Sequence, residues 1–154
     1  MAVRNQILEA LRNDLLSINN DNGFKTNVKQ VLKKEVALED QKEFPSIFPV
    51  SITTEIKELE GLKEYQWNVG LVLYYQVDRD PDGEGLASEF LEDFVDDVDD
   101  LFSERRTVEG GILVAEVKLV KCVESVEMIG FESDPINEQG KGLAYLILRI
   151  TYHK

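Results

Sequence analysis

The clearest structural signal in the sequence is the stretch Glu64–Val77, EYQWNVGLVLYYQV. Its odd-numbered positions are all apolar or aromatic, whereas its even-numbered positions mix polar residues with Val72 and Tyr74. Alternation with a period of two is typical of a strand that buries one face. At about 3.3 Å per residue this strand spans more than about 40 Å, so we expect it to overhang its own core and pack against something else.

Two segments have the three- and four-residue spacing of amphipathic helices, and they flank this strand in the chain. The first covers residues 3–18, with its apolar stripe on Val3, Ile7, Leu8, Leu11, Leu15 and Ile18. The second covers residues 86–102, with its stripe on Leu86, Phe90, Leu91, Phe94, Val95, Val98, Leu101 and Phe102.

The remaining segments predict further strands and the loops between them. We expect strands at residues 27–34, around 46–48, at 112–128 with a break near 120, and at 143–152. Pro45 and Pro49 bracket the second of these, so it should lie at a sheet edge or carry a bulge. Residues 35–43, 55–63 and 130–142 are expected to be long loops.

The order is therefore helix, three strands, helix, two strands. It predicts a single α+β domain over residues 1–154, with a mainly antiparallel sheet of four to five strands and two helices packed on one face.

Composition narrows the classes of function. The chain has 154 residues and a formal net charge of −13, from 30 acidic and 17 basic residues. Such a chain repels phosphate, which argues against specific binding of nucleic acid but suits a passage through which DNA slides.

Cysteine content and the absence of apolar runs narrow the classes further. Cys122 is the only cysteine, so an intrachain disulfide is impossible. The N-terminal stretch lacks the apolar core of a signal peptide, and no apolar run is long enough to span a membrane.

One short motif raises the possibility of a calcium site. The stretch DRDPDGEG, residues 78–85, begins as an EF-hand loop does, and its candidate ligands are Asp78, Asp80, Asp82, the main chain of Glu84, and Glu89. An EF-hand needs a helix on both sides, but here a strand enters the loop. Pro81 restricts the backbone, and Gly85 stands where an aliphatic residue is usual. The favoured interpretation is an acidic turn at the N-terminal end of the second helix, with no metal and no cofactor.

No set of residues predicts an enzyme. The acidic run from Asp96 to Asp100 is interpreted as a solvated helix face that is also suitable for electrostatic docking. His153, the only histidine, lies next to the end of the chain and makes a poor catalytic base. Cys122 is interpreted as a buried, inert thiol.

The order and spacing of these elements, over nearly the whole length, resemble the tail terminators of long-tailed phages, also called tail-completion or minor tail proteins. The stretches that carry the resemblance are RNQILEALRNDLLSI, NGFKTNV, KEFPSIFPV, EYQWNVGLVLYYQV, the acidic helix and GLAYLILRITYHK.

The resemblance implies a structural virion protein of the tail neck, assembled in the host cytoplasm. It would form a ring, usually a hexamer, that caps the tail tube, ends its growth and joins the head connector, while DNA passes through without specific binding. The alternatives are a neighbouring neck or tail-tube protein and a calcium-binding module. The expected contact surfaces are the loop 35–43, the even-numbered positions of 64–77 and the loop 130–142.

Overall fold

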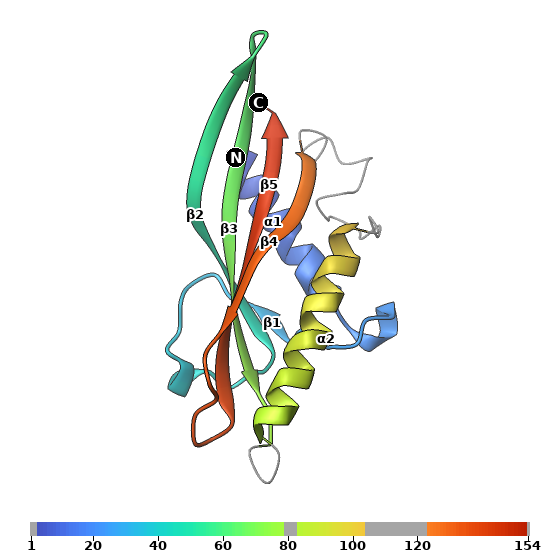
Figure 1. Ribbon diagram of the computed structural model, residues 1–154, viewed down its shortest axis with the longest axis vertical. Helices are drawn as coiled ribbons and strands as arrows, with labels where there is room; N and C mark the ends of the chain where they lie inside the picture. The colour runs from blue at the N-terminus through green and yellow to red at the C-terminus, as the bar shows by residue number, and fades with distance from the viewer. Residues whose placement is uncertain (1–2, 79–82, 104–122, 154) are drawn as a thin grey trace.

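The structure is a computed structural model that describes residues 3–78, 83–103 and 123–153 (Figure 1). Its elements are α1 (Val3–Leu16), β1 (Gln30–Val31), β2 (Ser46–Leu59), β3 (Leu62–Gln76), α2 (Gly83–Ser103), β4 (Val123–Ser133) and β5 (Lys141–His153), with short 3-10 turns at Asn20–Asn22 and Leu38–Asp40. The predicted α+β class and the predicted order of helices and strands are confirmed.

The five strands form one sheet in the order β1-β2-β3-β5-β4. Strand β3 lies in the middle and pairs antiparallel with β2 on one side and with β5 on the other. Strand β4 pairs antiparallel with the outer side of β5, and only the two-residue β1 runs parallel to its neighbour. The alternating stretch quoted above is thus the centre of the sheet.

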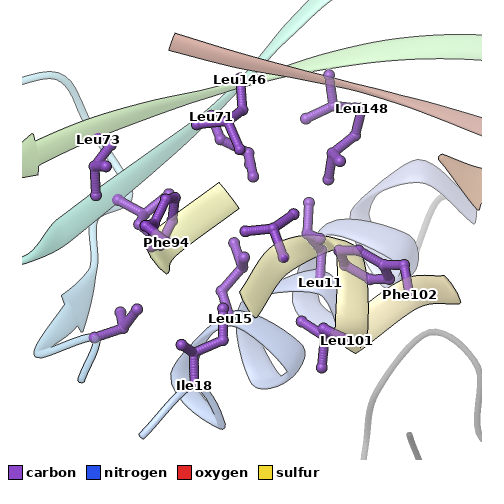
Figure 2. Close-up of a cluster of buried hydrophobic side chains, with 14 of the residues drawn as sticks. Leu11, Leu15, Ile18, Leu71, Leu73, Phe94, Leu101, Phe102, Leu146 and Leu148 are labelled. Carbon is purple, nitrogen blue, oxygen red and sulfur yellow. The ribbon is translucent and has the colours of Figure 1, made fainter. Parts of the chain in front are cut away.

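The two faces of β3 differ as its sequence predicts. We call the side that carries Trp67, Val69, Leu71, Leu73 and Tyr75 the odd face, and all five side chains are buried. They form one hydrophobic cluster with even-numbered residues of β5 and with both helices (Figure 2). Burial of each large side chain contributes about 1.5–3 kcal/mol, so this cluster dominates the stability of the fold.

Contacts from both helices reach the odd face. The guanidinium of Arg4, in α1, lies 4.9 Å from the centre of the Trp67 ring. The ring of Phe90, in α2, stacks on Tyr75 with 5.5 Å between ring centroids. Each helix thus contributes a ring or cation contact to the odd face, and the packing of both helices on one face of the sheet stays a prediction.

Three sequence-based expectations about boundaries are wrong. The expected strand 27–34 is reduced to Gln30–Val31. The expected loop 55–63 is the end of β2, a tight turn and the start of β3. The expected loop 130–142 begins later, because residues 130–133 belong to β4, while residues 112–122 of the expected strand 112–128 lie outside the described residues.

The missed part of β2 has a physical explanation. Residues 55–58 are exposed on both faces, so they have no apolar alternation to reveal a strand. The expected effect of the prolines is confirmed, because β2 carries a register shift between Ser51 and Thr53 and pairs with β1 only at Ser46 and Ile47.

Candidate interaction surface

The β2–β3 hairpin extends past the neighbouring strand β5 (Figure 1). Strands β2 and β3 pair as far as Leu59 and Leu62, whereas β5 pairs with β3 only as far as Glu64. The turn that joins β2 to β3 consists of Glu60 and Gly61, whose φ values are 50° and 85°. Positive φ at both central residues matches the right-handed twist of a hairpin, so the strands stay paired up to the tip.

Apolar side chains are exposed at this tip. Ile56 is 61% exposed and Leu62 is 64% exposed. Ile56 lies directly opposite Tyr65, whose ring stacks on Tyr152 at 5.0 Å between ring centroids. Residues 64–76 are paired with β5 along their whole length, so the expected overhang is limited to Leu62 and Lys63, and the tip offers apolar area to a partner.

The opposite side of β3, which we call the even face, carries a second apolar surface. A Cβ atom added to Gly70 would lie 3.0–3.2 Å from side-chain atoms of Tyr145, Ile52 and Val50. These side chains from β2 and β5 therefore converge over a glycine of β3 that leaves room for them. We call these four residues the even-face patch. Ile52 is 43% exposed, and Tyr145 is exposed to a similar degree.

A hollow of about 320 Å³ continues the even-face patch. Its apolar lining comes from Phe48, Val50, Val72, Leu143 and Tyr145, and its acidic rim from Glu35, Glu132 and Asp134. No residue of α1 or α2 lines it. The three segments expected to make contacts meet here, since Glu35 lies in the loop 35–43, Val72 is an even-numbered position of β3, and Asp134 lies in the range 130–142.

Both sides of the sheet leave backbone unpaired within the described part of the chain. On one side, β1 covers β2 only at Ser46 and Ile47, so the outer edge of β2 beyond Ile47 has no described strand beside it. On the other side, the outer strand β4 pairs only with β5 among the described strands. An unpaired edge presents rows of N–H and C=O groups that favour pairing with another chain.

The acidic turn is described in part. Asp78 is exposed just after β3, Glu84 and Glu89 are exposed on α2, and Asp80 and Asp82 lie outside the described residues. Helix α2 begins at Gly83, the sixth position of the calcium-loop pattern. The main-chain oxygen of Glu84 therefore lies in the first helical turn, where it accepts a helical hydrogen bond. The calcium hypothesis stays a prediction, and the favoured interpretation of these residues agrees with this helix start.

The acidic run on α2 is not the uniform solvated face that its sequence suggests. The Asp97 side chain is buried and accepts hydrogen bonds from the main-chain N–H groups of Lys25 and Thr26, at 2.9 and 2.8 Å, and from the Thr26 hydroxyl at 2.6 Å. Asp96 is exposed and pairs with Lys25 Nζ at 3.0 Å, which raises the pKa of Lys25 through this hydrogen bond and charge pair. A carboxylate can be buried where donors surround it, and helical spacing alone does not reveal those donors.

His153 is in β5 rather than on a free end. It lies opposite Glu64, and its Nε2 is 2.9 Å from Glu124 Oε2. One potential ligand atom from each of these three residues lies within 4.8 Å of the other two, so they could hold a divalent cation at an open site. These three residues come together because of the strand register, which cannot be read from the sequence. Cys122 lies outside the described residues.

No protein-family model matches the chain, and no curated protein matches it. The resemblance to tail terminators thus stays a prediction that rests on element order. Neither α1 nor α2, the two described helices, is both long and apolar enough to cross a membrane.

Proposed function

We propose that this chain is a structural subunit that assembles with copies of itself into a ring, a hexamer in the resembled family's pattern, at the end of a phage tail tube. The observation that carries the proposal is the even-face patch, an exposed apolar surface beside the part of β2, beyond Ile47, whose outer edge no described strand covers. An exposed apolar surface beside an open strand edge favours contact with another subunit, because that contact removes the apolar area from water.

Two further features support the same role. The hairpin tip carries Leu62 past the end of β5, and Ile56 is exposed just before the tip, where both can reach a neighbouring molecule. The acidity of the chain suits a ring through which DNA passes, because carboxylates repel the phosphate backbone. The ring would end tube growth and present its other end to the head connector, in the virion neck.

The first test compares two variants of exposed apolar residues. Ile52→Lys places a charge in the even-face patch, and Leu16→Lys does the same at a residue of α1 that is 44% exposed and lies outside the patch. Mass in solution by light scattering, with negative-stain images, should give rings for the wild type and for Leu16→Lys but not for Ile52→Lys. Circular dichroism melts confirm that both variants fold.

The same proteins are then added to tail tubes grown from tube subunits of the same phage. A terminator stops tube growth, whereas a tube protein forms long tubes by itself and a neck protein leaves tube length unchanged. If the wild type neither forms rings nor limits tube length, the proposed function is wrong. If Ile52→Lys assembles as the wild type does, the ring does not use the even-face patch.

A further inference from the structure

A groove of about 610 Å³ lies between α2 and β4. It meets the even-face hollow at Ser133 and Asp134, which line both, and Figure 1 shows α2 running beside β4. One wall is the helix ridge Ala87, Leu91 and Val95, whose four-residue spacing places the three side chains in a row. The facing wall includes Phe131, an exposed aromatic residue of β4. The groove therefore offers apolar contact on both sides.

Carboxylates surround this apolar row. Glu84, Glu92 and Asp96 line the groove from α2, and Asp134 lines it from the end of β4. No lysine, arginine or histidine is among the described residues that line it. Among the described ion pairs, Lys25 is the basic side chain that reaches this rim, where it bonds to Asp96. The groove thus has an apolar floor and a strongly negative border.

One end of the groove focuses this negative charge on Tyr75. The Tyr75 ring is fixed between Phe90, which stacks on it, and Gly142, where an added Cβ would come within 2.4–2.7 Å of the ring and its hydroxyl. Burial, followed by the charges of Glu84 and Asp134, raises the pKa of Tyr75. The two carboxylates therefore act on the same end of the groove, where a cation would be favoured.

We propose that this groove binds an extended segment of a partner protein in which lysine or arginine alternates with apolar residues. The apolar side chains would cover the row on α2 and Phe131, and a cationic side chain would reach Glu84 and Asp134. The outer edge of β4, which no described strand pairs with, supplies backbone groups for an added strand. That strand carries three glutamates and no basic residue, which favours a basic neighbour across it.

Charge decides among the possible occupants. A nucleic acid or another anion would be repelled by four carboxylates. A second copy of this chain is the alternative occupant, and the light-scattering test below distinguishes it. A basic segment of a different protein is complementary to the groove, and the inference does not rest on ring formation because every lining residue belongs to one subunit.

The test uses a short, end-capped peptide in which valine alternates with lysine, labelled for fluorescence anisotropy at low salt. The groove variant is Glu84→Gln with Glu92→Gln, two exposed residues that line the groove but not the even-face hollow. The matched control is Glu55→Gln with Glu58→Gln, which removes the same charge from exposed residues of β2. The groove variant should weaken peptide affinity by at least about tenfold, equivalent to about 1.4 kcal/mol, and the control by less than about twofold.

A second variant tests the site by shape rather than charge. Ser88 is exposed and lines the groove, so Ser88→Trp should fill it and abolish binding while α2 stays folded. Amide chemical shifts of the wild type should move along α2 and β4 on adding the peptide.

Three results would overturn the proposal: no binding by the wild type, equal weakening by the groove and control pairs, or unchanged binding by Ser88→Trp. Light scattering on the same variants separates this inference from the proposed function. The groove variants should keep the assembly state of the wild type, and a loss of rings in them would identify the occupant as a second copy and refute the partner proposed here.

Discussion

Replacing Asp97 by asparagine should strongly destabilise the protein, although the change keeps the size and shape of the side chain. Asp97 is 1% exposed. Its Oδ1 accepts from the Lys25 main chain, and its Oδ2 accepts from both the main chain and the hydroxyl of Thr26. The three bonds join α2 to the segment that follows α1, about seventy positions earlier in the chain.

The size of the destabilisation follows from how many of the three hydrogen bonds an asparagine side chain can still accept. Asparagine has one acceptor oxygen, so if it keeps the two Thr26 bonds its NH₂ group faces the Lys25 N–H. One bond to a charged acceptor is then lost, at about 1.5–3 kcal/mol, and the other two become weaker neutral bonds. We expect the free energy of unfolding to fall by about 2–4 kcal/mol. In a domain of this size that lowers the Tm by roughly 5–15 °C.

Urea denaturation followed by circular dichroism measures this loss. The control is Asp96→Asn, which removes the same charge one position away, where the carboxylate is exposed and meets only the Lys25 ammonium among the described contacts; it should change stability little. Thr26→Val, alone and combined with Asp97→Asn, completes a double-mutant cycle. The interaction free energy between the two residues should be about 1 kcal/mol. If Asp97→Asn unfolds within about 0.5 kcal/mol of the wild type, the buried carboxylate does not join the two segments as argued.

Two further predictions concern Tyr75 and can be checked on the same samples. Gly142→Ala should destabilise the fold by about 1–3 kcal/mol in urea, because the new methyl group would overlap the fixed Tyr75 ring; unchanged stability would mean that the ring moves freely. The pKa of Tyr75 is raised above 10.0, so its contribution to stability is complete below pH 10 and is lost as the pH rises through the folded-state pKa. Glu84→Gln with Asp134→Asn should lower that pKa, as measured by NMR of tyrosine labelled with ¹³C, and an unchanged value would contradict the assigned charge effect.

Strong periodicity made much of the fold predictable. The alternation around Trp67 identified the central strand, and the three- and four-residue spacing around Leu11 and Phe94 identified both helices, because burying one face requires these patterns. The second half of β2 was missed for the complementary reason. Its residues lie beyond the core, where exposure on both faces removes the pattern, so Ile52 of the even-face patch was also missed.

The candidate surfaces were predictable only in part. The three segments expected to make contacts were identified from polarity and loop length, but their meeting around one hollow depends on the pairing of β3 with β2 and β5. Asp97 illustrates the same limit. One acidic run contains an exposed carboxylate and a buried one, and the difference comes from donors contributed by residues 25 and 26.

By itself, the sequence determined the class of fold, the order of its elements, the buried side of the central strand and the acidity of the whole chain, because each of these is a local or additive property of the residues. Tertiary structure alone decided which apolar side chains stay uncovered, which carboxylate is buried, and where the α2–β4 groove lies. Those features depend on register and on distant segments meeting: Gly142 meets Tyr75, and Asp134 approaches Glu84 only because β4 and α2 lie side by side.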